Sequence, residues 1–163
     1  MPRPTETALR SRARALLEAM TARCRWIYAV PRDLGAQAVR PIALAAGLRA
    51  IEEEGSAARF SNERETASLV VFDSPELEVL FIEAAGDDAP PILADILEKT
   101  SFYAQSTLLG TALDVRDEEA GKALRTLAHM VVAWDEDWSD LFLLHLAAPD
   151  PVARHEATLA LTV

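Results

Sequence analysis

The stretch DPVARHEATLAL, residues 150–161, most strongly constrains what this chain can fold into. An aspartate followed by a proline is a strong signal for the start of a helix. Arg154, Ala157 and Ala160 then follow at intervals of three residues, which places them on one face of that helix. Small residues on one face allow a second helix to approach closely. The stretch therefore predicts a helix packed tightly against a neighbouring helix.

Two further segments repeat this spacing of an arginine and two small residues. They are Arg40, Ala43 and Ala46, and Arg125, Ala128 and Val131. Only six glycines and 6% aromatic residues occur, and this composition favours helix over strand. We therefore expect helices over most of the chain, with a loop at 56–62 and a turn at 135–140. The expected helices span residues 5–28, 33–54, 74–85, 91–113, 118–134, 140–148 and 151–161. Two of them have alternatives: Pro41 either kinks the helix at 33–54 or divides it into two shorter helices near Arg40, and the helix at 91–113 is either continuous or broken near Thr100-Ser101.

The stretch at 150–161 resembles the second helix of a HEAT repeat, in which an Asp-Pro turn leads to an arginine, then alanines, then a leucine. The matching residues are Asp150, Pro151, Arg154, Ala157, Ala160 and Leu161. Residues 33–48 match poorly, because the turn lacks the proline and Pro41 falls inside the helix. The resemblance implies an all-α fold, in which antiparallel helix pairs stack as a short α-solenoid forming a single domain over residues 1–163.

One segment leaves a different fold class open. Residues 67–72 contain β-branched residues and a phenylalanine, which are typical of a strand. Such a strand would need a partner, and residues 25–30 are the only segment that suggests one. The alternative is therefore an α+β fold with a small sheet made from residues 25–30 and 67–72. Pro75 and Gly86, placed as a helix start and a helix stop, favour the helical interpretation.

Charge is distributed unevenly along the chain. Residues 1–32 contain seven arginines and two glutamates, whereas residues 33–163 contain nine basic and twenty-four acidic residues. An acidic body of this kind repels nucleic acid and anionic membranes. We therefore expect neither of these as a partner. Cys24 is the single cysteine, and no apolar run is long enough to cross a membrane, so we expect a soluble, cytoplasmic protein.

No sequence signature of an enzyme stands out. The chain contains neither a glycine-rich phosphate loop nor a Gly-x-Ser-x-Gly turn. The pair His155-Glu156 resembles the metal-binding pairs of deoxyhypusine hydroxylase, a HEAT-type di-iron family. That chemistry needs several such pairs and this chain has one. We therefore expect no catalytic residue, no metal and no cofactor.

The segment AWDEDWSD, residues 133–140, is the best candidate for binding a partner. Tryptophan is enriched at binding hot spots, and acids beside it would attract a basic protein. The candidate residues are Trp134, Asp135, Glu136, Asp137 and Trp138, together with Arg10 and Arg14 on the basic N-terminal segment. In the alternative interpretation both tryptophans turn inward, and Trp138 packs on Leu141 or Phe142.

The sequence thus predicts a non-catalytic protein-interaction or scaffold module with an unidentified protein partner. Self-association is also expected, through the C-terminal helix or through a head-to-tail contact between the basic N-terminal segment and an acidic surface. Two alternatives remain. One is a helical enzyme or metal protein whose site the sequence does not reveal. The other is an acidic inhibitor or immunity-type protein that binds a basic partner.

Overall fold

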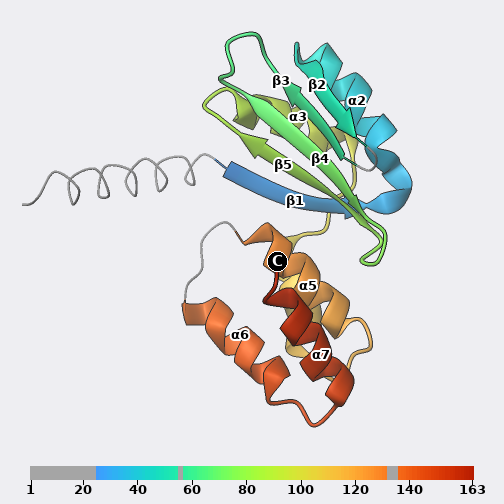
Figure 1. Ribbon diagram of the computed structural model, residues 1–163, viewed down its shortest axis with the longest axis vertical. Coiled ribbons are helices and arrows are strands. Elements are labelled where there is room, and N and C mark those ends of the chain that lie inside the picture. The colour runs from blue at the N-terminus through green and yellow to red at the C-terminus, as the bar shows by residue number, and fades with distance from the viewer. Residues whose placement is uncertain (1–24, 55–56, 132–135) are drawn as a thin grey trace, which may run out of the picture.

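The computed structural model describes residues 25–54, 57–131 and 136–163, and within these ranges it combines an antiparallel sheet with six α-helices (Figure 1). The fold is therefore α+β, and the prediction of an all-α, HEAT-like solenoid is wrong. Residues 25–30 and 67–72, which suggested a small sheet, do fall in or at strands. They are not paired with each other, however, because another strand lies between them.

The sheet has five strands in the order β1-β5-β4-β3-β2, and all neighbours are antiparallel. Four of the strands follow one another along the chain, whereas β1 lies beside β5, the last of them. The strands are β1 (Arg25–Pro31), β2 (Arg49–Glu54), β3 (Ala57–Ser61), β4 (Ser68–Ser74) and β5 (Val79–Ala85). The predicted loop at 56–62 is thus mostly a strand.

The predicted helix at 74–85 is wrong, since residues 75–78 form a turn and β5 follows it. The apolar run that begins at Val79 is buried on both sides of the sheet. A strand buried on both faces lacks the alternation of a half-exposed strand, so periodicity alone does not separate it from a helix. Gly86 ends this strand rather than a helix. Its φ is 103°, and a Cβ there would lie 2.3 Å from the carbonyl oxygen of Thr66.

The predicted helix at 33–54 is also wrong in its second half. Helix α2 (Gly35–Ala45) accommodates Pro41, but the chain leaves the helix at Gly47, whose φ is 83°. Strand β2 then pairs with β3, so the glutamate-rich end of the segment is extended. Pairing with a neighbouring strand here outweighs the helical preference of glutamate and alanine. At the other end, residues 25–28 of the predicted N-terminal helix lie in β1, and the rest of that prediction lies outside the described residues.

Helices α2 and α3 (Ala89–Lys99) cover one face of the sheet, which we call the first face. Alternate residues of the strands point toward these helices and form the largest core. Representative members are Val30, Phe60, Leu69 and Ile82 from the sheet, and Ile96 from α3; each is at most 1% exposed.

The remaining helices form a layer against part of the opposite, second face (Figure 1). They are α4 (Gln105–Leu113), α5 (Ala120–Met130), α6 (Glu136–Leu146) and α7 (Pro151–Ala160). The helix predicted over 91–113 is interrupted at residues 100–104, in agreement with the alternative that it breaks near Thr100-Ser101. The predicted turn at 135–140 is wrong, because residues 136–140 belong to α6. Helix α5 provides the contact with the sheet: His129 lies 4.7 Å from Phe81, ring centroid to ring centroid, and Phe81 stacks on Phe72.

Helix α7 agrees closely with the prediction for residues 151–161. The Asp150 side chain accepts a hydrogen bond from the amide of Val152 at 3.0 Å and caps the helix. The Arg154 guanidinium donates to the carbonyl oxygens of Ala148 and Pro149, both at 2.7 Å. The small residues Ala157 and Ala160 are buried. The local packing pattern was therefore interpreted correctly, although the helix belongs to a different fold.

Candidate functional site

Most of the predicted partner-binding residues cannot be placed. Arg10, Arg14, Trp134 and Asp135 lie outside the described residues, as does Cys24. Glu136 and Asp137 fall in the first turn of α6, and their side chains are not described. Trp138 is half-buried and packs against the apolar cluster of the helical layer, which contains Leu141 and Phe142. Its position agrees with the alternative in which this tryptophan turns inward.

A concave region lies where one end of the sheet meets the helical layer. Two adjoining cavities, of about 640 Å³ and about 220 Å³, share Glu78 and Tyr103. We call them together the interlayer cleft. Its charged lining residues are Arg32, Asp33, Asp73, Glu78, Glu119 and Lys122. Its other lining residues are Pro31, Leu77, Val79, Leu80, Tyr103, Thr107, Leu108, Thr111, Ala123 and Thr126.

The β4–β5 turn, residues 75–78, positions Glu78 at the centre of the cleft. Leu77 is 4% exposed and anchors the turn in the core between the layers. Glu78 adopts φ 58°, its amide donates to the carbonyl oxygen of Pro75 at 3.3 Å, and its carbonyl accepts from the amide of Arg32 at 3.2 Å. This backbone conformation is uncommon for a residue other than glycine. The glutamate is held there by bonds on both sides of its backbone.

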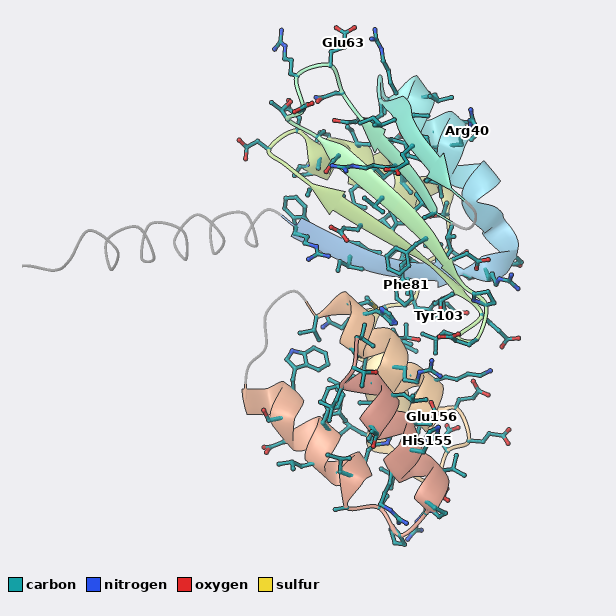
Figure 2. All side chains as sticks on the ribbon, in the orientation of Figure 1. Arg40, Glu63, Phe81, Tyr103, His155 and Glu156 are labelled. Atoms are coloured by element: carbon teal, nitrogen blue, oxygen red, sulfur yellow. The ribbon has the colours of Figure 1, made fainter. Side chains whose placement is uncertain are left out.

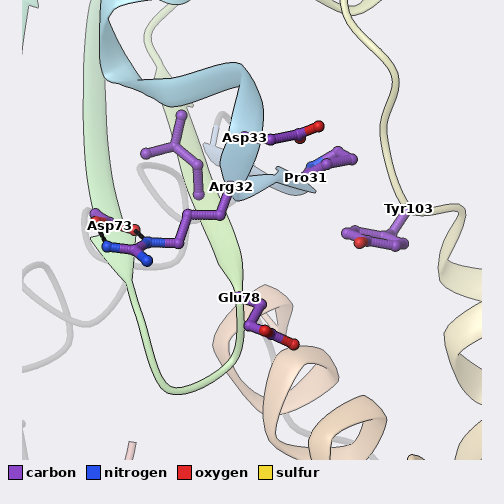
Figure 3. A pocket seen from close by; sticks show the side chains of 7 residues that line it. Pro31, Arg32, Asp33, Asp73, Glu78 and Tyr103 are labelled. Atoms are coloured by element: carbon purple, nitrogen blue, oxygen red, sulfur yellow. Dashed lines mark hydrogen bonds and ion pairs between the residues drawn. The ribbon is translucent and has the colours of Figure 1, made fainter.

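Ion pairs fix both cations of the cleft. Arg32 makes a two-pronged contact with Asp73, at 2.8 Å and 3.0 Å, and is directed away from Tyr103 (Figure 3). The Lys122 ammonium lies 3.0 Å from a carboxylate oxygen of Glu78 and 3.7 Å from one of Glu119. Four carboxylates therefore line the cleft against two cations, and both cations are already engaged.

These contacts also stabilise the ionised forms of Glu78, Lys122 and Arg32. The hydrogen bond from Lys122 lowers the pKa of Glu78, and the hydrogen bond to Glu78 raises the pKa of Lys122. The hydrogen bond to Asp73 raises the pKa of Arg32. A general acid or base works best with a pKa near the operating pH, and all three pKa values are moved away from neutrality. Ionised side chains of this kind can bind a charged group.

None of the three histidines lies in the cleft. His145 is buried, its Nε2 lies 2.5 Å from the carbonyl oxygen of Ala112, and its Nδ1 has no hydrogen-bond partner. His155 is exposed on α7, while the carboxylate of Glu156 faces Arg125 of α5 at 3.5 Å (Figure 2). Within the described ranges, no three histidine, cysteine or carboxylate side chains are grouped so that they could hold a metal ion.

Sequence reasoning missed the cleft because its residues are far apart along the chain. They come from β1 and the short 3₁₀ helix η1 (Arg32–Leu34), from β4, β5 and the turn between them, from the α3–α4 linker and α4, and from α5 and the residue before it. The helix predicted at 74–85 includes Glu78, whereas in the structure Glu78 is the last residue of the β4–β5 turn. The signal that could have revealed the turn is Ser74-Pro75, between two runs rich in β-branched and aromatic residues.

Comparison with known proteins yields no relative: no protein-family model, no curated protein and no solved structure matches this chain. The HEAT-repeat resemblance is therefore contradicted by the sheet and unsupported by any family. None of the helices in the described part of the chain is both long enough and apolar enough to cross a membrane.

Proposed function

We propose that the protein is a non-catalytic binding module that recognises a basic partner protein through the interlayer cleft. The observation that carries this proposal is the balance of charge in the cleft. Four carboxylates line the two cavities of the cleft, and its two cations, Arg32 and Lys122, are paired within it. A positively charged surface would complement the excess of carboxylates over cations in the cleft.

The charge of the whole chain supports the same proposal. Residues 33–163 contain twenty-four acidic and nine basic residues, so a basic protein is attracted from a distance before it makes contact. An acidic inhibitor of a basic enzyme would be one form of such a module. The pKa directions of Glu78, Lys122 and Arg32 favour their ionised forms near neutral pH, and the binding of a charged partner uses ionised groups.

The test is capture of the partner from the native cell by the purified full-length protein. We expect a partner rich in lysine and arginine that is retained at about 0.1 M salt and released at about 1 M salt, where surface charges are screened. The double variant Asp33→Asn/Glu119→Gln should reduce the captured amount about tenfold.

The matched control removes the same charge elsewhere. Glu63 and Asp95 are exposed carboxylates that lie outside the cleft, paired with Arg49 and Lys99 respectively. The double variant Glu63→Gln/Asp95→Asn should capture as much partner as the unmodified protein. Equal loss in both double variants, or a captured partner that is not basic, would contradict the proposal.

A further inference from the structure

Three side chains from separate parts of the chain line the larger cavity (Figure 3). Asp33 comes from the short 3₁₀ helix η1 (Arg32–Leu34), Glu78 from the β4–β5 turn, and Tyr103 from the α3–α4 linker. We propose that Asp33, Glu78 and Tyr103 form a binding site for an arginine side chain of the partner. This inference rests on the proposed function and specifies the chemistry of the same cleft.

The two carboxylates supply the acceptors that a guanidinium needs. Lys122 donates to one oxygen of Glu78, Oε2, and an ionised carboxylate accepts at about four lone-pair sites, so capacity for a further donor remains. Asp33 is exposed and also lines the cavity. A guanidinium presents five donors in a planar fork, and it can therefore bridge two carboxylates that lie on different sides of it.

Tyr103 supplies a flat aromatic surface to the same cavity. Its amide donates to the carbonyl oxygen of Ala29 at 2.9 Å, which fixes the linker to the outer edge of β1. The residue remains 36% exposed. A guanidinium stacks on an aromatic ring while its edge still donates hydrogen bonds, whereas a lysine ammonium is a compact and strongly hydrated charge. The combination of ring and carboxylates thus favours arginine over lysine.

The cations of the described chain do not occupy this position. Arg32 is directed to Asp73, and Lys122 contacts Glu78 and Glu119 from the α5 side. The cavity of about 640 Å³ is open, so the end of a side chain can reach it from outside. Charge complementarity points to a partner's arginine as the occupant.

Tyrosine-selective NMR provides a direct test on the full-length protein, because the chain contains two tyrosines, Tyr28 and Tyr103. The probe is an acetylated and amidated Gly-Arg-Arg-Gly peptide, compared with Gly-Lys-Lys-Gly. The ring signals of Tyr103 should shift and saturate with the arginine peptide, and those of Tyr28 should shift less. The lysine peptide should bind at least about threefold more weakly.

Variants define the contribution of each group. Asp33→Asn and Glu78→Gln should each weaken peptide binding about three- to tenfold. Tyr103→Phe should retain binding, because the ring remains, and Tyr103→Leu should lose it. Asp95→Asn removes one exposed charge on α3, outside the cleft, and should leave the affinity unchanged. A thermal melt of each variant confirms that the protein is folded.

Four outcomes would overturn the proposed arginine site. Equal affinity for the two peptides, or an equal loss in Asp95→Asn, would show nonspecific attraction. A further variant replaces the chain's own N-terminal arginines by glutamine, namely Arg3, Arg10, Arg12, Arg14 and Arg23. If the Tyr103 signals of this variant shift in the absence of peptide, the site belongs to these arginines and not to a partner. If partner capture depends on the cleft carboxylates but the arginine peptide does not bind, the arginine site alone is overturned. Loss of cleft dependence in the capture experiment would instead contradict the proposed function.

Discussion

At the scale of single residues, Glu78 combines an unfavourable backbone conformation with a side chain that makes a favourable ion pair. Its φ of 58° lies in the left-handed region, where a Cβ is crowded against the following carbonyl oxygen. Its carboxylate nevertheless meets Lys122 at 3.0 Å. Glycine would suit the backbone better and would lose the carboxylate. Keeping glutamate at this position is consistent with a use for that carboxylate, as in the proposed binding site.

Comparing two substitutions of Glu78 separates these effects. Both Glu78→Gly and Glu78→Gln remove the charge, but only glycine relieves the backbone. We therefore expect the glycine variant to melt about 2–4 °C higher than the glutamine variant. Thermal unfolding followed by circular dichroism measures the difference. Equal melting temperatures would mean that the turn relaxes and that the left-handed conformation costs nothing.

His129 provides a second prediction at this scale, on pH dependence. Burial against the sheet, and secondarily the charge of Arg125, lower its pKa below the ordinary value of 6.5. As the pH falls below about 6.5, the unfolded chain binds this proton first, so folded-state stability decreases. His129→Phe keeps a ring beside Phe81 and removes the titration. The loss of stability between pH 7 and pH 5, measured by urea unfolding, should be smaller in the variant than in the unmodified protein.

At the scale of elements, helices α5 and α7 approach each other at Gly121. A Cβ at this position would lie 2.6 Å from Cγ and 2.9 Å from Cβ of Glu156. Alanine normally stabilises a helix interior relative to glycine by about 1 kcal/mol. Here the added methyl group must separate the helices or displace Glu156. We therefore expect Gly121→Ala to destabilise the protein by about 1–3 kcal/mol.

Gly110 on α4 is the matched control, because a Cβ there would meet no atom within 4 Å. Gly110→Ala should stabilise the protein by up to about 1 kcal/mol. Chemical denaturation of both variants measures the change in the free energy of unfolding, which should have opposite signs in the two. If Gly121→Ala also stabilised the protein, the close approach of α5 and α7 would not exist in solution.

The elements also show what the sequence can and cannot predict. Helix α7 was predicted well, because Asp150, Pro151 and the spaced alanines encode a local structure with strong end signals. Strand β5 was predicted as a helix, because a doubly buried strand lacks a period of two. The cleft was missed for a different reason. Asp33, Glu78 and Tyr103 line one cavity because β1 pairs with β5 and because the Tyr103 amide is hydrogen-bonded to Ala29 of β1, contacts that join distant segments.

At the scale of the whole molecule, the sheet and the helical layer share a core. Leu77 and Phe81 from the sheet side pack with Met130 of α5, and each is at most 9% exposed. Arg125 of α5 links Glu76 of the β4–β5 turn, at 2.9 Å, to Glu156 of α7, at 3.5 Å. An interface of this kind couples the unfolding of both layers, so the cleft between them should persist for as long as the protein is folded.

Two tryptophans make this coupling measurable. Trp26 packs on the sheet core, and Trp138 packs on the cluster of the helical layer. Variants that retain only one of them, with Trp134 also replaced by phenylalanine, report on the two layers separately. Phe81→Leu, made in both backgrounds, removes volume from the shared core and should cost about 1–2 kcal/mol. Since the layers unfold together, the denaturation midpoints reported by Trp26 and by Trp138 should decrease by the same amount. If only the midpoint reported by Trp26 decreases, the helical layer folds independently of the sheet. The cleft would then open without unfolding of the sheet.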